Sequence, residues 1–179
     1  GNWELPADGW PRMLKDARHS AWTDAKLAAE PAEAWAVSLS DADADKGDLV
    51  RQEWATHVDI PGPVTPATIL GDTVLVALTH QQAVVALDRK TGKEKWRTDI
   101  DGRIDSPPVQ VNETAFVGTR TGWVYAIDRG SGKVRWRFLA APHQQLIPAS
   151  GQAESAWPLA GSLLIHDGLV WAAAGHQAE

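Results

Sequence analysis

The chain has no cysteine among its 179 residues, and this absence excludes several kinds of site at once. It excludes disulfides, thiolate metal sites and c-type haem attachment. No apolar run approaches the roughly 20 residues that are needed to span a bilayer. The six histidines, at positions 19, 57, 80, 143, 166 and 176, show no H-x-x-x-H metal spacing. There is also no G-x-S-x-G motif, no phosphate-binding glycine loop and no Rossmann fingerprint, so the residues predict no catalytic constellation.

Positive charge is scarce as well. Lysine and arginine total 17 against 23 acidic residues, a formal net charge of −6, which argues against a nucleic-acid-binding surface. Other aromatics are few, with two phenylalanines and one tyrosine, but there are ten tryptophans. This bias indicates a structural position that recurs along the chain and requires tryptophan.

A repeat of about forty residues supplies such a position. Residues 83–96, AVVALDRKTGKEKW, return without a gap as residues 123–136, WVYAIDRGSGKVRW. The equivalent pairs are Asp88 and Asp128, Gly92 and Gly132, and Trp96 and Trp136. A fixed period of this length is the signature of a repeat architecture.

Each repeat reads as four short strands. Residues 83–87 form an apolar, β-branched run that suits a strand buried on both faces, and the polar turn that follows ends in glycine, which is typical of a hairpin. The strands expected in the two units are residues 66–70, 73–78, 83–87 and 93–98, and then 106–111, 114–118, 123–128 and 134–138. Four strands at this period predict an all-β protein, a β-propeller with four-stranded antiparallel blades.

A large flat aromatic at a fixed point of the outer strand would fill the gap between neighbouring blades. We assign this docking role to Trp96 and Trp136, and more loosely to Trp54, and we expect Trp96 and Trp136 to be buried. Asp88 and Asp128, with Gly92 and Gly132, would shape the hairpin on which docking depends.

The motif A-x-D-x-x-(T/S)-G-K-x-x-W, at residues 86–96 and 126–136, resembles the pyrroloquinoline-quinone-type (PQQ-like) β-propeller repeat with its tryptophan-docking motif. The segments DGRIDSPPV, GTRTGWVYAID, WRFLAAP and ESAWPLAGSLLIHDGLVWAAAG resemble a planctomycete-type branch of exported PQQ-like proteins. The resemblance is strong over residues 62–175. It implies a periplasmic or extracellular location and a chain that continues through further blades, so we expect this sequence to be a fragment of a larger propeller.

We therefore divide the chain into five parts. They are an N-terminal segment with a partial blade and an acidic loop at 1–53, two blades at 54–98 and 99–139, a rim insertion at 140–155 and a partial blade at 156–179. In the last part, SAWPLAG aligns with DSPPVQV of the preceding blade. In the first part, residues 35–39, WAVSL, alternate well enough for a strand.

One segment has the residue pattern of a possible metal site. In residues 41–48, DADADKGD, the carboxylates of Asp41, Asp43 and Asp45 alternate as the first ligands of a calcium loop do. However, Lys46 stands where such a loop requires glycine, and Gln52 stands where it requires a bidentate glutamate. We favour a solvated acidic loop and keep calcium as the alternative.

The rim insertion interrupts the repeat, and segments of this kind carry function more often than scaffold strands do. Its polar members are His143, Gln144, Gln145, Gln152 and Glu154. We favour a rim loop that holds no ligand.

Two functions remain in competition. The first is a non-catalytic scaffold or binding module whose partner is a protein or further propeller blades, and we favour this binding protein over an enzyme. The alternative is a fragment of a PQQ-dependent quinoprotein oxidoreductase whose cofactor residues lie outside this chain. The resemblance leaves PQQ and Ca²⁺ as candidate cofactors, but the calcium ligands and the catalytic aspartate of those enzymes cannot be placed here residue by residue. A weaker third hypothesis is carbohydrate binding by Trp3, Trp10 and Trp157.

Overall fold

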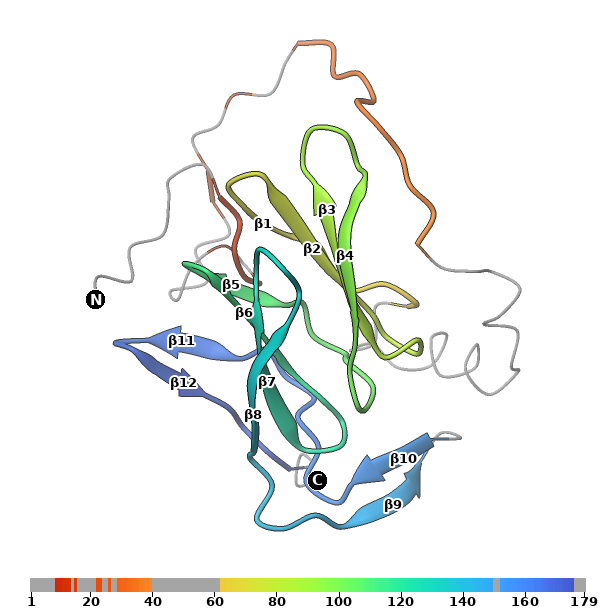
Figure 1. Ribbon diagram of the computed structural model, residues 1–179, viewed down its shortest axis with the longest axis vertical. Coiled ribbons are helices and arrows are strands. Elements are labelled where there is room, and N and C mark those ends of the chain that lie inside the picture. Colours follow the sequence, from red (N-terminus) through yellow and green to blue (C-terminus); the bar gives the residue numbers. More distant parts are fainter. Residues whose placement is uncertain are drawn as a thin grey trace.

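The computed structural model describes residues 9–13, 15, 22–23, 26, 29–39, 62–149 and 152–175, and this described part is all-β (Figure 1). The first four-stranded sheet consists of β1 (Thr68–Leu70), β2 (Thr73–Leu78), β3 (Ala83–Asp88) and β4 (Glu94–Asp99). The second consists of β5 (Val109–Val111), β6 (Thr114–Gly118), β7 (Trp123–Asp128) and β8 (Val134–Leu139). Two hairpins follow, β9 (Leu146–Ala149) with β10 (Gln152–Ser155), and β11 (Leu164–His166) with β12 (Leu169–Trp171). None of the described residues belongs to a helix that could cross a membrane.

The two four-stranded sheets are successive blades with the same antiparallel order, β1-β2-β3-β4 and β5-β6-β7-β8. Both carry a register shift between the third and fourth strands, at Ala86/Leu87 in the first blade and at Ala126/Ile127 in the second. The shifts lie forty residues apart, so the sequence repeat is reproduced down to this irregularity of the backbone.

The alternation of side chains along the middle strands explains why they are buried on both faces. Leu75 and Val84 of the first blade belong to a core cluster that also contains Tyr125 and Ile127 of the second blade. The neighbouring Val76 and Val85 point to the opposite face and join a cluster with Trp35 and Leu39. Because successive residues of a strand face opposite sides, an unbroken apolar run builds two interfaces at once.

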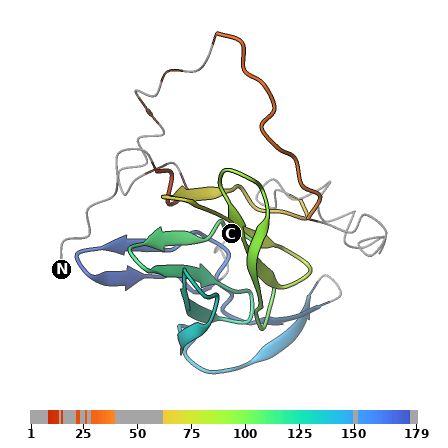
Figure 2. The ribbon, with the colours of Figure 1, turned by 45° about the horizontal axis from the view of Figure 1, so that its top comes forward.

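The first strands of the blades lie next to one another, since β5 contacts both β1 and β11. Figures 1 and 2 show β11–β12 beside the second blade. A third cluster, which includes Val109 and Phe116 of the second blade and Ile165 of β11, joins these parts. Hairpin β11–β12 therefore supplies the first two strands of a third blade.

The sequence alignment pairs SAWPLAG, residues 155–161, with DSPPVQV of the preceding blade, but the first strand of the third blade does not lie in this segment. The strand is β11, which begins at Leu164. The backbone N–H of Leu159 instead donates to the Thr119 carbonyl oxygen over 3.1 Å, and its side chain is buried against Gly118. The segment before β11 is thus used to cover the second blade.

A short N-terminal stretch ties the first strands together. Trp10 exchanges two backbone hydrogen bonds of 2.7 Å with Ile69, the middle residue of β1, and the Pro11 carbonyl accepts a hydrogen bond from the Gln110 N–H in β5. The buried side chain of Arg12 donates through Nη1 to the Ile165 carbonyl oxygen of β11 over 3.0 Å. Residues 10–12 therefore contact three blades in sequence.

These observations confirm the prediction of an all-β partial propeller with four-stranded antiparallel blades. The segment boundaries at 53, 98, 139 and 155 stay predictions.

Candidate functional site

The rim insertion predicted at 140–155 contains a hairpin, β9–β10, that is fastened to the second blade at both of its ends. The Ala140 N–H donates to the Gly122 carbonyl over 2.9 Å, and the Ser155 N–H donates to the Arg120 carbonyl over 2.7 Å. Gly122 has a φ of +88°, and a Cβ built there would lie 2.9 Å from the Cβ of Ala141. Glycine at position 122 therefore allows the insertion to approach the β6–β7 turn closely.

Four charged side chains form a closed cluster beneath the hairpin. Arg103 donates through Nε to Asp105 Oδ1 over 2.7 Å and through Nη2 to Asp105 Oδ2 over 3.1 Å. Arg120 donates through Nε to Asp105 Oδ2, the oxygen that also accepts from Arg103 Nη2. Glu154 of β10 closes the arrangement, with 3.6 Å to Arg103 Nη1 and 3.5 Å to Arg120 Nη1.

This four-charge cluster of Arg103, Asp105, Arg120 and Glu154 is nearly dry. The side chains of Arg103, Asp105 and Glu154 are only 1%, 2% and 4% exposed. Charges removed from water in this way are tolerated only when they are paired and hydrogen-bonded, and two cations facing two anions meet that condition. The cluster joins strand β10 to the loop between β4 and β5 and to the turn between β6 and β7, so it fixes the position of the hairpin.

Polar contacts also reach the first blade. Gln152 at the start of β10 lies 2.9 Å from His80 Nδ1 through its Nε2 atom and 3.5 Å from Gln82 Nε2 through its Oε1 atom. His80 and Gln82 belong to the turn between β2 and β3. The hairpin therefore bridges the two complete blades.

The outward side of the hairpin is accessible. Leu146 is 47% exposed, and Pro148 and its cross-strand partner Ala153 are also exposed. His143 and Gln145 form a 3.2 Å hydrogen bond at the surface, and the His143 ring packs edge-on against Trp157. Of the polar residues predicted for the insertion, Gln152 and Glu154 thus hold the hairpin in place, whereas His143, Gln144 and Gln145 lie on its exposed side.

The sequence did not single out Arg103, Asp105 or Arg120. Their only signal was that the two arginines occupy glycine-flanked turns, in DGRID and GTRTG, where no helix or strand explains them. The pairing itself depends on residues brought together by the propeller, which the linear sequence cannot show.

At the interface between the first two blades, Trp96 of β4 rests on the turn between β7 and β8. Its Nε1 donates to the Arg129 carbonyl over 2.8 Å, and a Cβ built on Gly132 would lie 2.7 Å from its ring. Thr98 donates to the Gly132 carbonyl over 2.6 Å. Gly132 has a φ of +75°, so both its conformation and the close approach of the indole favour glycine.

Trp35 makes the same contacts one blade earlier, a role that was not predicted from the sequence. Its Nε1 donates to the Arg89 carbonyl over 2.9 Å, and a Cβ on Gly92 would lie 2.5 Å from its ring. Residues 35–39 were expected to form a strand, but they do not. The signal that could have identified Trp35 was the likeness of WAVSL to WRTDI at 96–100, which the longer spacing between the two tryptophans concealed.

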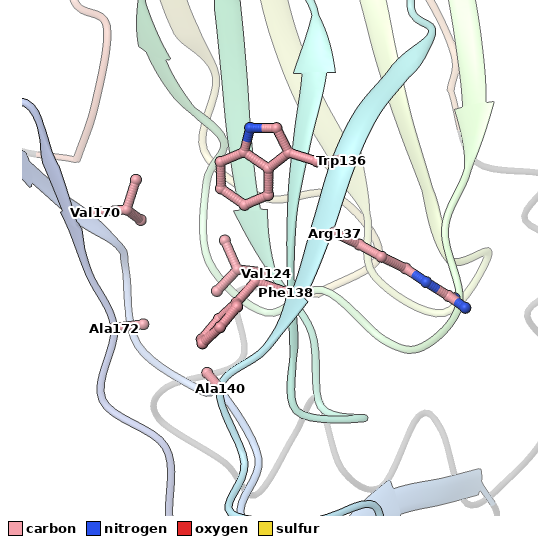
Figure 3. Close-up of a pocket in the computed structure, with 7 residues that line it drawn as sticks. All are labelled: Val124, Trp136, Arg137, Phe138, Ala140, Val170 and Ala172. Carbon is pink, nitrogen blue, oxygen red and sulfur yellow. The ribbon is translucent and has the colours of Figure 1, made fainter.

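The expectation that Trp136 is buried is wrong, because its side chain is 44% exposed, compared with 8% for Trp96. The physical reason is that the described part of the third blade has only two strands, so it offers no turn between a third and a fourth strand for the ring to contact. The ring instead packs against Phe116, with 5.9 Å between the ring centroids. Trp136 lines a groove of ≈ 610 Å³. Figure 3 shows Trp136 with the other lining residues, which are Val124, Arg137, Phe138, Ala140, Val170 and Ala172.

The two aspartates of the repeat organise their turns. Asp88 Oδ1 accepts hydrogen bonds from the Thr91 hydroxyl and N–H, each 2.8 Å long, and Asp128 Oδ1 accepts the equivalent bonds from Ser131. Hydrogen bonds from Thr91 lower the pKa of Asp88. The pKa of Asp128 is lowered further, first by the hydrogen bond from Arg135 and then by Ser131.

A dependence of stability on pH follows from the lowered pKa of Asp128. A carboxylate whose folded pKa lies below its unfolded value stabilises the fold fully above about pH 4 and loses that effect as the pH falls toward the folded pKa. The difference in free energy of unfolding between the wild type and Asp128→Asn should therefore be constant near neutral pH and shrink below about pH 4. Urea unfolding across this range measures it. Arg135→Gln, which removes the main cause of the shift, should weaken the pH dependence, and an unchanged dependence would contradict the assignment.

The candidate calcium ligands Asp41, Asp43 and Asp45 lie outside the described residues, and so do Trp3 and Trp54. Within the part that the structure describes, no three histidine, aspartate or glutamate side chains come together to hold a metal. The two buried carboxylates, Asp105 and Glu154, are both engaged by guanidinium groups. The described donor set therefore does not fit a calcium–quinone site.

The repeated four-stranded blades and adjacent first strands define a β-propeller repeat protein of the PQQ-like class. The model of the PQQ_2 family, described as outer membrane protein assembly factor BamB, matches residues 27–173, and the chain belongs to this family. Comparison with curated proteins found no match.

Solved structures share the fold at low identity. Quinohemoprotein alcohol dehydrogenase from Comamonas testosteroni is 17% identical with a TM-score of 0.57, over 90% of this chain and 22% of the other. A europium-containing methanol dehydrogenase is 16% identical with a TM-score of 0.50, over 78% and 24%. BamB from Moraxella catarrhalis is 21% identical with a TM-score of 0.47, over 61% and 33%. The chain thus spans a third or less of the length of these proteins.

Proposed function

We propose that this chain is a non-catalytic propeller scaffold of an exported protein and that it binds another protein through hairpin β9–β10. The observation that carries the proposal is the four-charge cluster, which fastens the hairpin to the blades while the outward side stays exposed. A binding element that is held rigidly before contact loses little conformational freedom when its partner arrives.

The hairpin suits a partner in extended conformation. Its sheet has only two described strands, so each strand has an edge that pairs with no other described strand. Such an edge can accept a further strand through backbone hydrogen bonds, and exposed Leu146 and Pro148 would contact alternate side chains of the added segment. The family's description as an outer membrane protein assembly factor supports a partner of this kind, because barrel strands are extended and alternate between apolar and polar residues.

The competing function, a fragment of a quinoprotein oxidoreductase, is supported by the likeness of folds alone. Its cofactor ligands would lie outside this chain, so no contact of the described residues supports it. Binding through the hairpin rests on contacts of the described residues, so we favour it.

The test uses the natural full-length protein and a fluorescent peptide of about ten residues that alternates valine and threonine, as a barrel strand does. We expect saturable binding by anisotropy, weakened about tenfold by Leu146→Asp because the new carboxylate would be desolvated on contact. Leu169→Asp, which alters a similarly exposed leucine on β12, is the matched control and should leave affinity unchanged. Titration with PQQ and Ca²⁺ should show no saturation. Saturable quinone binding would overturn the proposal. An equal loss of peptide affinity in Leu146→Asp and Leu169→Asp would also overturn it.

A further inference from the structure

We infer that the partner strand pairs with β9 rather than with β10, runs antiparallel to it, and ends its pairing at Pro148. The inference rests on the proposed function and deepens it, because it names the edge, the direction and the backbone groups that the partner must offer. It follows from the direction in which each backbone N–H and C=O group of the hairpin points.

The hydrogen bonds of the hairpin show which backbone groups of β9 point outward. The Ala156 N–H donates to the Gln145 carbonyl over 3.0 Å, so these two residues form a hydrogen-bonded pair. Leu146 and Ser155 are the next pair along the ladder, and Pro148 belongs to the pair two steps further on. Because hydrogen-bonded and non-hydrogen-bonded pairs alternate along an antiparallel ladder, the outward groups of β9 are those of Leu146 and Pro148.

The bond made by Ser155 agrees with this alternation and shows that β10 faces the blades. Its N–H donates away from the hairpin, to the Arg120 carbonyl over 2.7 Å. The side chain of Glu154 lies in the four-charge cluster, and Gln152 contacts His80 of the first blade. Figure 1 shows β10 on the blade side of the hairpin. A partner strand can therefore reach β9 without displacing these contacts.

The outward edge of β9 offers three backbone groups. Leu146 supplies an N–H and a carbonyl, whereas Pro148 supplies a carbonyl alone, because proline has no N–H. None of these three groups forms a hydrogen bond to another residue within the described part of the chain. The edge can therefore make a two-way pair at Leu146 and a one-way bond at Pro148.

These three groups favour an antiparallel partner. In an antiparallel ladder a residue exchanges both of its bonds with one opposite residue, so three consecutive partner residues satisfy all three groups. A parallel partner makes the same bonds only over five residues, because each β9 residue then bonds to the neighbours of the residue opposite it. Ordering two further residues costs backbone entropy that no additional hydrogen bond offsets.

Pro148 ends the pairing. Its ring takes the place of the outward N–H, so the partner carbonyl that faces it finds no donor. Proline is confined to sheet edges where its nitrogen faces solvent, and a longer added strand would cover that nitrogen. The paired stretch is thus limited to the Leu146 end of β9, and this short pairing protects the edge from extended sheet formation between molecules.

The exposed side chains of β9 determine which partner N–H groups are bound. Leu146 and Pro148 lie on the exposed face of the hairpin, and residues opposite one another in a ladder share a face. An apolar partner side chain packs best beside Leu146, which is 47% exposed. In an antiparallel pair, the apolar residues of the partner therefore direct their N–H groups at β9, and the polar residues between them direct theirs away.

The test uses the natural full-length protein and the alternating valine–threonine peptide in two N-methylated forms. Methylation of every valine nitrogen should weaken binding in anisotropy about tenfold, because it removes the donors to the Leu146 and Pro148 carbonyls. Methylation of every threonine nitrogen should change the Kd by less than about twofold, because these N–H groups stay in water. The reverse pattern would indicate a parallel partner, and equal Kd values for the two methylated peptides would indicate that the backbone is not bound. Either result would overturn the inference without depending on the folding of a protein variant.

Pro148→Ala tests the end of the pairing. The variant restores an outward N–H, so the unmethylated peptide should bind about fivefold more tightly, which corresponds to one added hydrogen bond. Pro142→Ala, which replaces an exposed proline of the preceding loop, is the matched control and should leave the affinity unchanged. Unchanged or weaker binding by Pro148→Ala would contradict the role of Pro148.

The outcomes separate this inference from the proposed function. If the unmethylated peptide does not bind the wild type, the proposed function is wrong and the inference is wrong with it. If the peptide binds but the methylated forms do not differ, the inference alone is wrong. Self-association in sedimentation that excludes the peptide would also overturn it, because a second copy of the chain would then occupy the edge of β9.

Discussion

Replacing Asp105 by alanine is expected to lower the free energy of unfolding by about 3–5 kcal/mol. Asp105 is the carboxylate that both Arg103 and Arg120 contact, and its removal leaves two guanidinium groups with Glu154 as the remaining anion of the cluster. Arg103 is almost completely buried, so its charge cannot be compensated by water. Breaking a buried ion pair in this way costs far more than losing an exposed one.

Urea unfolding followed by circular dichroism gives the measurement, and Asp99→Asn is the matched control. The Arg97–Asp99 pair is 3.6 Å long, but its side chains are 39% and 87% exposed, so the control should cost less than about 1 kcal/mol. If Asp105→Ala and Asp99→Asn lowered the free energy of unfolding by the same small amount, the cluster would contribute little to stability. The proposed rigid base of β9–β10 would then lack support.

The second large effect is expected for Trp96→Ala, at about 3–5 kcal/mol, because the indole is buried between two blades and its N–H is bonded to Arg129. The variant would leave a cavity over Gly132 and an unsatisfied carbonyl. The same urea unfolding experiment measures the loss.

Trp136→Ala is the matched comparison, since it removes the same side chain from the equivalent strand position. Because the residue is 44% exposed, we expect a cost of about 1 kcal/mol or less in the free energy of unfolding of the chain alone. The sequence predicted burial at both positions, which would make the two losses equal. Equal measured losses would show that Trp136 is buried in solution.

The strands of the two complete blades could be predicted from the sequence because every signal agreed there. The run AVVAL has the apolar, β-branched composition of a buried strand, and Asp88 with Gly92 encodes the turn after it, and both patterns recur at 123–132. Local composition and the global period pointed to the same strands.

The candidate site and the third blade could not be predicted in the same way. The partners Arg103 and Glu154 meet only because the propeller places a turn beneath the insertion, and no local pattern encodes that contact. The alignment of Pro158 and Leu159 with the strand entry of the preceding blade did not locate β11, because this segment packs against the second blade instead. Trp35 was overlooked because its spacing to Trp96 departs from the forty-residue period. Each failure occurs where tertiary contact overrides the local repeat.

The contact of Arg12 with Ile165 carries a consequence for the order of folding. It joins residues 153 positions apart, whereas the strand pairs within each blade join near neighbours. Closing so long a loop is slow compared with forming a hairpin, so the hairpins should form first and the N-terminal stretch should dock last. During synthesis residues 10–12 leave the ribosome before any blade exists, and their carbonyl and amide partners on β1, β5 and β11 emerge one after another. The contacts of residues 10–12 can therefore all form only after the first strands of all three blades have folded into position.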